Sequence, residues 1–346
     1  MTRRAGRSGA DAVRVAVFGT GRIGREMIKG CAADPGIDVV AAVVTDPAKD
    51  GVDIGKLAGM PPAGVAATTD LEAVLARPDV DLVFYCGLGD PPAVAEHLGH
   101  FAERGKDVIT LTGMIHPVAA LGEDGAARLH RRALAGGARV VGAGWNPGFL
   151  LDVLPVIWGT SCVRIDRVFA QRVAEMRDWG AGVHEECGIG LPPDQVGDTD
   201  SNPLHESVAL IADALGIELE RIDNMHEPYV SSIPREHAGR RVEAGHNAGF
   251  HKRSLGISGG QPRIEIEMYG VFCLDPVDPV AEGAKVVVEG DSTVETEARG
   301  NWFGDSYPVT AAKAIRAVGP LTILAPGLYR PDQLPLSGPG RFPGDT

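Results

Sequence analysis

The sequence predicts an α/β protein in two parts: an N-terminal doubly wound parallel sheet and a C-terminal α+β domain with an open mixed or antiparallel sheet. Up to residue 147, short and nearly all-apolar segments alternate with helical patterns, which is typical of parallel strands joined by crossover helices. Beyond residue 150 the predicted strands are longer and no longer alternate strictly with helices. The 346 residues, 44% of them hydrophobic, suffice for two cores of ordinary domain size.

Composition and charge narrow the range of partners. The formal net charge of −13 argues against a nucleic acid, which binds a basic face. No apolar run approaches the roughly 18 residues of a membrane helix, so no membrane partner is expected. The 5 cysteines are odd in number and widely spaced, which predicts neither disulfides nor a cysteine metal pair and indicates a cytoplasmic location. The histidines stand apart from other ligand types, so we expect no metal.

The first element after a flexible tail over residues 1–12 is a buried strand over residues 13–18, which runs into a glycine-rich turn and a helical pattern. The turn reads Gly19-Thr20-Gly21-Arg22-Ile23-Gly24. The first glycine permits a tight turn, the second lets a pyrophosphate approach the backbone, and the third lets helix and strand pack closely. N–H groups at the start of the helix would bind the pyrophosphate. We therefore predict a dinucleotide-binding Rossmann domain over residues 13–147; the alternative is a glycine-rich turn without a ligand.

The end of the second strand bears on the choice between NAD and NADP. NAD sites usually place an acidic residue there to bind both ribose hydroxyls. Here Thr45 precedes Asp46, and Thr45 can hydrogen-bond a 2′-phosphate whose charge Arg22 and Lys49 would neutralise. These residues favour NADP. Asp46 could instead bind the ribose of NAD, or simply form a turn with the proline after it.

The later elements of the first domain repeat the same unit. We predict strands over residues 37–44, 81–86, 107–111 and 139–141, and helices over residues 71–75, 91–104 and 124–134. Ligands of such sheets bind beyond the carboxyl ends of the strands. Cys86 and Gly87, where one strand ends, are therefore predicted to contact the cofactor.

The second domain is predicted over residues 148–305. Its expected strands cover residues 163–173, 263–271 and 285–289, and its expected helix covers residues 202–215 with Asn202 as the cap. Open sheets of this kind commonly supply a dimer contact, so we expect a homodimer. A last helix, within residues 306–330, is expected to return to the first domain, and residues 331–346 are expected to form a tail rich in proline and glycine.

Several motifs together resemble one oxidoreductase family. They are GTGRIGRE at residues 19–26, the loop at 46–49 and 52–59, GWNPGFLLDVLP at 144–155, residues 242–249 and 261–266, and the last helix and turn at 311–328. The chain resembles the dihydrodipicolinate-reductase-like oxidoreductases, in particular the branch that holds 2,4-diaminopentanoate dehydrogenase and the native amine dehydrogenases. This resemblance covers most of the chain.

Two departures from the family motifs bear on the substrate. The His-His and Lys motif with which dihydrodipicolinate reductase holds its dicarboxylate is absent, so that reaction is not expected. The amine dehydrogenase branch carries a glutamate after the fifth strand that anchors ammonia or the substrate amine, whereas residues 110–117 here contain no carboxylate. Reductive amination with free ammonia therefore does not carry over from the family. Thr112 and Gly113 resemble the Thr-Thr-Gly loop of dihydrodipicolinate reductase, which implies that they line the nicotinamide.

His116 is the predicted catalytic residue. Forming an iminium from a ketone and an amine requires proton transfer, and reducing a carbonyl requires a proton donor. An imidazole ordinarily titrates near neutral pH, and His116 follows the carboxyl end of a strand, where function concentrates. The alternative is that His116 is only a turn residue before Pro117.

Further side chains are assigned around the reactants. Asn146 is predicted to hold the nicotinamide carboxamide, with turn chemistry before Pro147 as the alternative. The residues assigned to the substrate pocket are Met114, Trp145, Glu175 and His184. The last two belong to a glycine-bearing segment that either closes over substrate or is a solvated surface loop. Arg240 and Arg241 are interpreted as simply exposed.

These features predict an NAD(P)-dependent oxidoreductase of the amine dehydrogenase or imine reductase type, which acts on a small amine, imine or ketone. One alternative is a carbonyl oxidoreductase on the same scaffold, with His116 as the proton donor. Another is a cofactor-binding sensor without turnover.

Overall fold

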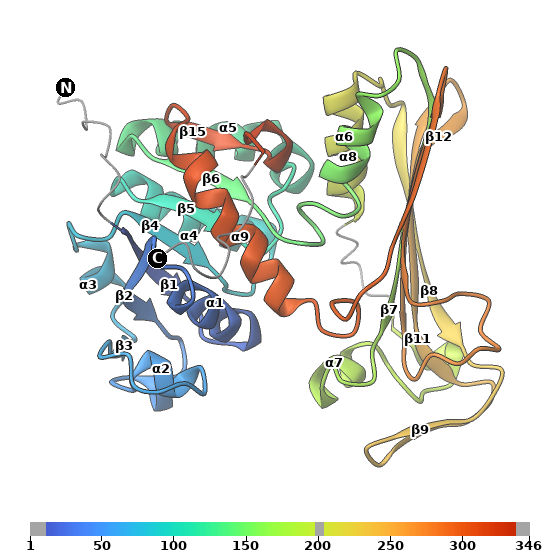
Figure 1. The fold of residues 1–346 in the computed structure, drawn as a ribbon, viewed down its shortest axis with the longest axis horizontal. Coiled ribbons are helices and arrows are strands. Elements are labelled where there is room, and N and C mark those ends of the chain that lie inside the picture. Colours follow the sequence, from blue (N-terminus) through green and yellow to red (C-terminus); the bar gives the residue numbers. More distant parts are fainter. Residues whose placement is uncertain (1–11, 198–203, 337–346) are drawn as a thin grey trace. The chain divides into compact units, whose positions relative to one another are not determined.

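The computed structural model describes residues 12–197 and 204–336 (Figure 1). These residues form two compact units. The first unit comprises the chain up to Gly144 together with the chain from Tyr307 onward, and the second comprises Trp145–Ser306. Most of the two predicted tails lies outside the described residues.

The first unit is built on a seven-stranded sheet in which neighbouring strands are parallel. The order across it is β15-β6-β5-β4-β1-β2-β3. The strands are β1 (Val13–Phe18), β2 (Ile37–Val43), β3 (Ala67–Thr68), β4 (Leu82–Tyr85), β5 (Asp107–Thr110), β6 (Arg139–Gly142) and β15 (Gly327–Tyr329). The strand order changes direction between β1 and β4, which confirms the predicted doubly wound sheet and places its ligand crevice at the carboxyl ends of these two strands.

Helices cover both faces of this sheet (Figure 1). They are α1 (Arg22–Ala32), α2 (Ile54–Leu57), α3 (Leu71–Leu75), α4 (Pro91–Glu103), α5 (Pro117–Gly136) and α9 (Tyr307–Thr322). Alternate residues of β1 enter separate cores: Val15 and Val17 pack with α1 and α9, whereas Ala16 and Phe18 pack with α4. The strands are apolar throughout because both of their faces are buried.

The helix α5 differs from the prediction at its start. Periodicity predicts a helix over residues 124–134, whereas α5 begins at Pro117. Gly122 inside it has φ of 70° and ψ of 169°, which is not helical, so the chain is kinked there. The kink breaks the repeat of apolar positions, and the pattern therefore showed only the part of the helix after Gly122.

The C-terminal segment completes the first unit. Ala314 and Leu321 of α9 lie in the same core as Met27 of α1, and β15 pairs with β6. The last helix thus lies within the predicted range 306–330, and the edge strand after it was not predicted. Two short 3-10 helices also belong to this unit: η1 (Pro47–Lys49) and η3 (Pro331–Gln333), the second within the predicted tail.

The second unit is built on a six-stranded open sheet with the order β14-β13-β7-β12-β11-β8. Its strands are β7 (Ile165–Glu175), β8 (Arg221–Val230), β11 (Asn247–Ser258), β12 (Gln261–Val271), β13 (Gly283–Gly290) and β14 (Thr293–Ala298). Only β7 and β12 are parallel among neighbouring pairs of these strands; the others are antiparallel. This confirms the predicted α+β domain with an open mixed sheet.

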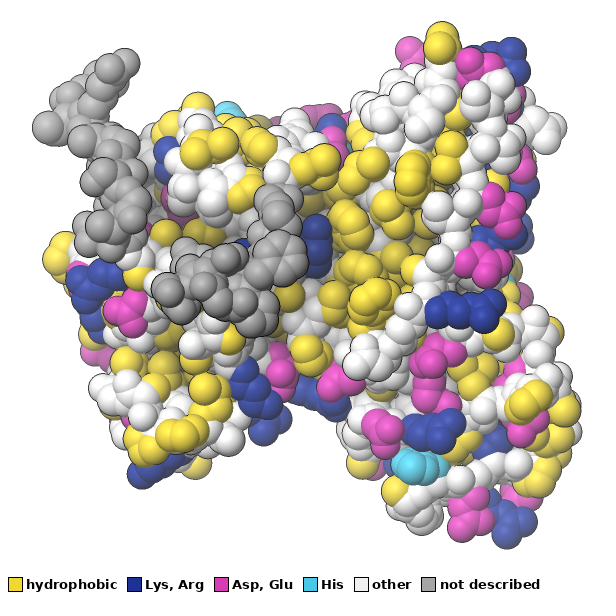
Figure 2. All heavy atoms as spheres, in the orientation of Figure 1, with side chains coloured by type: hydrophobic (Ala, Val, Ile, Leu, Met, Phe, Trp, Pro, Cys, Tyr) yellow, Lys and Arg dark blue, Asp and Glu magenta, His cyan; other side chains and the backbone are white. Residues whose placement is uncertain are grey.

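One face of this sheet carries helices and the other carries charged side chains. Figure 1 shows α6 (Val153–Gly159) and α8 (Leu204–Leu215) side by side against one face. The predicted cap Asn202 lies outside the described residues. On the opposite face Glu265 pairs with Arg167 and Arg253, and the rings of His251 and Tyr269 stack with centroids 4.1 Å apart. Acidic and basic side chains are interspersed over the visible side of this unit in Figure 2.

Three further elements of the second unit lie at one end of the sheet. They are α7 (Ala181–Glu186), η2 (Pro193–Gln195) and a hairpin of β9 (Arg235–His237) and β10 (Arg240–Val242). The hairpin turn consists of Ala238 and Gly239, both with positive φ, which is typical of a two-residue type I′ turn. Over the described ranges, no helix has the length and apolar character that crossing a bilayer requires.

Candidate functional site

The glycine-rich turn between β1 and α1 forms an open cradle. Gly19 has φ of +89°, and a Cβ on it would lie 2.9 Å from the carbonyl oxygen of Cys86. A Cβ on Gly24 would lie 1.9 Å from the carbonyl oxygen of Gly19, so this glycine lets α1 pack on β1. A Cβ on Gly21, by contrast, would meet no atom of the described chain within 4 Å. Packing within the unit therefore requires the first and third glycines, and leaves open space beside the second.

The flanking residues place this cradle at the predicted crevice. The N–H of Gly19 donates to Val43 of β2 at 2.9 Å, and the N–H of Cys86 donates to Phe18 of β1 at 2.8 Å. Thr20 is buried. The carboxyl ends of β1, β2 and β4 are therefore held together around the start of α1, where a helix N-terminus favours an anion.

The remaining predicted cofactor residues at this crevice are two at the start of α1 and two just after β4. The guanidinium of Arg22 lies 4.7 Å from the centre of the Tyr307 ring, in a cation–π contact. Ile23 packs against the core that α1 shares with α9. The thiol of Cys86 is buried, and burial raises its pKa, so it is protonated and unreactive. Gly87 contributes its carbonyl oxygen, which accepts a hydrogen bond from the Thr112 hydroxyl at 2.5 Å.

The turn after β2 holds the residues that bear on cofactor choice. Thr45 is exposed. Asp46 is the N-cap of η1: its Oδ1 accepts from the N–H of Ala48 at 3.0 Å, and its carbonyl oxygen accepts from the N–H of Lys49 at 3.0 Å. The predicted turn chemistry of Asp46 is therefore present, and the hydroxyl of Thr45 is left on the surface beside it.

The loop after β5 is tightly built. Thr110 is fully buried, and its Oγ1 accepts from the N–H of Thr112 at 3.1 Å. Gly113 and Met114 both have positive φ, 60° and 63°, and Met114 is buried within the hydrophobic core of the first unit. A Cβ on Gly142 of β6 would lie within 2.7 Å of the Gly113 and Met114 carbonyl oxygens, so the loop can sit against β6 only because position 142 is glycine. A left-handed, buried methionine marks backbone strain of the kind that concentrates at functional loops.

His116 is buried and caps the helix α5. Its Nδ1 accepts a hydrogen bond from the N–H of Ala119 at 3.0 Å. In the neutral ring the proton therefore resides on Nε2, as this hydrogen bond assigns it. His116 therefore has the structural role that is the alternative to catalysis, because its Nδ1 caps the helix that begins at Pro117. Its Nε2 is the atom that can donate a proton.

The start of the second unit gathers aromatic rings. Trp145 lies 5.5 Å from Phe149 and 5.4 Å from Trp302, measured between ring centroids. The Nδ2 of Asn146 lies 3.7 Å from the Sδ of Met268, and its Oδ1 is buried without a partner in the described chain. The indole N–H of Trp145 is buried without a partner there as well.

A buried carboxylate braces this segment. Asp152 has no exposed surface and accepts hydrogen bonds from the N–H of Gly148 at 2.9 Å, the N–H of Val153 at 2.7 Å and the hydroxyl of Ser207 at 3.1 Å. Burial raises the pKa of Asp152 to about 6, although the hydrogen bonds oppose that shift. Asp152 therefore ties the loop after Asn146 to both α6 and α8.

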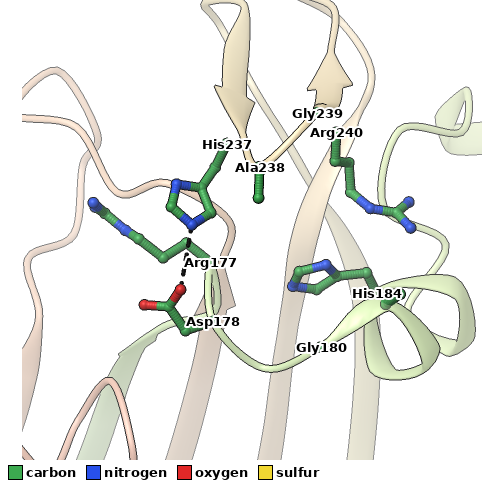
Figure 3. A pocket seen from close by; sticks show the side chains of 9 residues that line it. Arg177, Asp178, Gly180, His184, His237, Ala238, Gly239 and Arg240 are labelled. Atoms are coloured by element: carbon green, nitrogen blue, oxygen red, sulfur yellow. Dashed lines mark hydrogen bonds and ion pairs between the residues drawn. The ribbon is translucent and has the colours of Figure 1, made fainter.

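The second unit contains a cavity of about 610 Å³ (Figure 3). It lies between the segment 177–184 and the turn of the β9–β10 hairpin. Figure 3 shows His237 of the hairpin facing Asp178, with 3.2 Å between Nε2 and Oδ1. His184 and Arg240 form the other side of the cavity. The structure thus brings the predicted His184 together with a polar set of side chains.

The two predicted residues of this segment differ in their surroundings. Glu175 is not part of the cavity wall; its carboxylate accepts from the N–H groups of Cys273 and Leu274 and pairs with Arg177 at 2.6 Å. His184 is buried, and its Nε2 bonds the carbonyl oxygen of Met176 at 2.7 Å. Two residues of the cavity wall are therefore held by contacts outside the cavity. Arg177 pairs with Glu175, which the backbone of Cys273 and Leu274 anchors, and His184 bonds the Met176 carbonyl oxygen.

Sequence reasoning missed the hairpin side of the cavity. Arg240, interpreted as simply exposed, is half-buried and lines the cavity, whereas Arg241 is exposed and pairs with Glu243. The only signal was Gly239 after Ala238, which is a weaker turn signature than Asn-Gly. No group of three or more His, Cys, Asp or Glu that could hold a metal occurs among the residues described.

Two family models match the chain. Residues 149–338, more than half of the chain, match the 2,4-diaminopentanoate dehydrogenase C-terminal domain. Residues 13–119 match the dihydrodipicolinate reductase N-terminus.

Similar proteins agree with these matches. The chain is 25% identical to a 2,4-diaminopentanoate dehydrogenase of Acetoanaerobium sticklandii, over 74% of this chain and 75% of the relative. It is 27% identical to an amine dehydrogenase of Streptomyces virginiae, over 94% and 96% of the two chains. The solved amine dehydrogenase of Mycobacterium smegmatis has the same fold, with a TM-score of 0.80 at 20% identity over 95% and 97% of the two chains.

These matches confirm the family resemblance and the two-part fold that the sequence predicts. The matched models cover parts of both units, and the first unit has the sheet order and glycine turn of an NAD(P)-binding domain. The chain is therefore an oxidoreductase with an NAD(P)-binding fold, and it belongs to the 2,4-diaminopentanoate dehydrogenase family.

Proposed function

We propose that this chain is an NAD(P)-dependent amine dehydrogenase, which interconverts a small amine and the corresponding ketone by way of the imine. The observation that carries the proposal is the pairing of an open dinucleotide cradle with a second unit of this family. The relatives named above are dehydrogenases of an amine or a diamino acid, which supports an amine as the substrate here.

The residues present fit a dinucleotide. Gly21 borders open space where a pyrophosphate would lie against the first N–H groups of α1, with Gly19, Thr20 and Gly24 shaping the turn. The unpaired Oδ1 of Asn146 is an acceptor suited to the N–H of a carboxamide. When bound, the nicotinamide donates or accepts the hydride.

We propose NADP as the preferred cofactor, with NAD as the alternative. Thr45 presents an exposed hydroxyl at the end of β2, and the Asp46 carboxylate is engaged in capping η1. Lys49 in η1 is the nearest cation in sequence to a 2′-phosphate at this turn. A free acidic side chain, which would select NAD, does not end this strand.

His116 is proposed to move the proton that imine formation and hydrolysis require. Its Nε2 carries the proton in the neutral ring, and the capping bond fixes the ring at the end of the 111–116 loop. Thr112 and Gly113 are proposed to line the nicotinamide, and Met114, Trp145, Glu175 and His184 to shape the substrate site. Of these four, Met114 and Glu175 are proposed to support the site without contacting substrate. The Met114 side chain packs in the hydrophobic core, and the Glu175 carboxylate bonds the backbone N–H of Cys273.

We further propose a cytoplasmic homodimer. The five cysteines are free thiols, which suits a reducing compartment. The sheet face with Arg167, Glu265 and Arg253 carries no helix in the described part of the chain, and Phe169 and Val287 lie opposite each other on it. A second copy applied to this face would cover these apolar side chains.

The experiment follows nicotinamide absorbance with a panel of ketones, each with and without ammonium or a primary amine, and with NADPH or NADH. Oxidation of the cofactor only when an amine is present supports the proposed activity. Oxidation with ketone alone identifies a carbonyl oxidoreductase instead, an alternative favoured by the lack of a carboxylate in residues 110–117. Cofactor binding without turnover in any combination contradicts both enzyme assignments.

A further inference from the structure

The first residue of α1 is a cation at an electrostatically unfavourable place. Arg22 follows the N-cap Gly21, and α1 has neither a side-chain cap nor an acidic residue in its first turn. The N-terminus of a helix carries a partial positive charge, which attracts a carboxylate or phosphate and disfavours a guanidinium. Local conflicts of this kind concentrate at functional sites, where a ligand resolves them.

Three other helices of the first unit begin in the usual way. The N-caps of α2, α3 and α4 are Asp53, Asp70 and Asp90, and each carboxylate accepts a hydrogen bond from an N–H of the first turn. These carboxylates satisfy the N–H groups and complement the helix dipole. At the start of α1 the corresponding residue is Gly21, with open space beside it. The start of α1 therefore suits an anion that comes from outside the described chain.

The aromatic ring of Tyr307 holds the guanidinium of Arg22. The guanidinium carbon lies 4.7 Å from the centre of the ring, which is a cation–π distance. Both residues are half-buried, and Tyr307 is the first residue of α9, directly after the second unit. A cation–π contact engages the face of a guanidinium, whereas its hydrogen bonds are made in its plane. The ring can therefore fix Arg22 in place while the guanidinium binds an anion.

The helices α1 and α9 begin at the same end of the pair that they form. The contacts between them follow the same order along both helices: Arg22 with Tyr307, Gly30 with Ile315, and Asp34 with Arg316. At the second of these contacts, a Cβ on the glycine would lie 2.7 Å from the isoleucine Cδ1. Two helix N-termini and one guanidinium thus concentrate positive charge near the glycine turn.

The position of α9 bears on which phosphate of the cofactor Arg22 can bind. The helix α1 packs on β1 and β2, whereas α9 packs on β5 and β6, which lie on the other side of β1 from β2. Thr45 and Lys49 follow β2. The Tyr307 ring therefore holds the guanidinium on the side of α1 away from this turn. The sequence predicts Arg22 beside a 2′-phosphate, whereas the contact with Tyr307 favours the pyrophosphate.

We propose that Tyr307 is a positioning residue for the cofactor: its ring holds Arg22 where the guanidinium binds the pyrophosphate, which NAD and NADP share. A guanidinium binds phosphate oxygens through parallel N–H donors, and the first N–H groups of α1 bind the same anion. Arg22 and Tyr307 thus set the affinity for both cofactors, and Thr45 and Lys49 distinguish them. This proposal rests on the dinucleotide cradle of the proposed function.

Calorimetric titration of the full chain with NADPH and with NADH tests the role of Arg22. Arg22→Gln should weaken the binding of both cofactors by a similar factor, roughly 10- to 100-fold, as expected for a lost hydrogen bond between charged groups. Arg316→Gln is the matched control, because it removes the same charge at the other end of the α1–α9 pair, and should change neither affinity by more than about twofold. A loss confined to NADPH would place Arg22 at the 2′-phosphate and overturn the proposal.

Variants of Tyr307 test the positioning role. Tyr307→Leu and, as a second apolar replacement, Tyr307→Met should weaken the binding of both cofactors by roughly three- to tenfold, because the cation–π contact is lost. Tyr307→Phe keeps the ring face and should bind both cofactors as the wild type does. In the double variant Arg22→Gln/Tyr307→Leu the second change should add no further loss, because Tyr307 acts through Arg22. Additive losses, unchanged affinity in a folded apolar variant, or equal losses in Tyr307→Phe and Tyr307→Leu would overturn the positioning role.

Binding without turnover separates this proposal from the proposed function. A wild-type chain that binds neither NADPH nor NADH would contradict both. A chain whose cofactor affinity depends on Arg22 and Tyr307 as stated, but which oxidises no amine, would contradict the proposed amine dehydrogenase activity alone.

Discussion

At the scale of single residues, His116 combines a structural bond and a proposed proton transfer in one ring. Asparagine is also a good N-cap, so His116→Asn keeps an acceptor for the Ala119 N–H and removes the group that moves a proton. We expect turnover of ketone plus amine to fall by roughly 10²- to 10⁴-fold, with cofactor affinity nearly unchanged. Steady-state kinetics and cofactor titration measure the two quantities.

The same variant tests the hydride step separately. A preformed imine needs no proton transfer for its formation, so His116→Asn should reduce it at close to the wild-type rate. An equally large loss with the preformed imine would assign His116 to positioning the loop rather than to moving a proton.

The buried carboxyl group of Asp152 should make the folded chain more stable at low pH than at neutral pH. Its folded pKa of about 6 lies above the ordinary carboxyl value of 3.8, so the buried charge is unfavourable above pH 6 and is absent at low pH. Relative to Asp152→Asn, the wild type should therefore gain about 3 kcal/mol of unfolding free energy as the pH falls from 7 to below 4.

Chemical denaturation of wild type and Asp152→Asn at matched pH values provides the measurement for Asp152. The quantity to plot is the difference between the two free energies of unfolding. Parallel pH curves would show that the carboxylate titrates alike in the folded and unfolded chains.

Residue roles could be predicted from the sequence only where a backbone requirement dictates the residue type. The glycines at 19 and 24 follow from the close approaches that a tight βα turn demands. The role of Glu175 could not be predicted, because its carboxylate bonds the backbone of Cys273, which is 98 residues away in the chain. The lack of partners at the buried Nε and Nη2 of Arg172 likewise depends on which groups the fold places around β7.

At the scale of elements, different glycines of the β1–α1 turn are expected to serve cofactor binding and protein stability. Gly21→Val should abolish dinucleotide binding and leave the melting temperature near that of wild type, because a side chain there meets open space in the described chain. Gly24→Ala should instead lower stability, because its Cβ would overlap the Gly19 carbonyl oxygen. Calorimetric cofactor titration and thermal melts of both variants check this. Unchanged affinity in folded Gly21→Val would contradict the assigned cradle.

The turn between β2 and η1 is expected to set the cofactor. Thr45→Asp places a negative charge beside the proposed 2′-phosphate, and should lower the ratio of kcat/KM for NADPH to that for NADH by about tenfold or more. Lys49→Ala should weaken NADPH binding while sparing NADH. A wild-type chain that strongly selects NADH would indicate that Asp46 binds the ribose.

Apolar patterning predicted the buried strands of the first unit, but it missed several boundaries, the short elements and the long strands β8 and β11. The buried strands of the first unit and the long strand β12 matched their predicted positions closely. The start of α5 was missed because Gly122 interrupts the helix, and the β9–β10 hairpin was missed because Ala238 gives no turn signature. Pairing with distant strands, rather than local propensity, stabilises such short segments.

At the scale of the whole molecule, the uncovered face of the mixed sheet is expected to bind a second copy of the chain. Phe169→Glu introduces a charge beside Glu265 in the middle of this face, and should convert a dimer into a monomer. Light scattering coupled to gel filtration gives the mass. Ile323→Glu, at a side chain 73% exposed on the first unit, is the control and should leave the mass unchanged. A wild-type monomer would contradict the proposed dimer.

The discontinuity of the first unit has a consequence for how the chain matures on the ribosome. The strands β1 to β6 are synthesised before the second unit, but the core that Val15 and Val17 enter is closed by α9, near the end of the chain. The second unit is one uninterrupted segment and can complete its core as soon as it emerges. The unit that is made first is therefore finished last, and until α9 emerges its sheet carries an apolar face that chaperones can occupy.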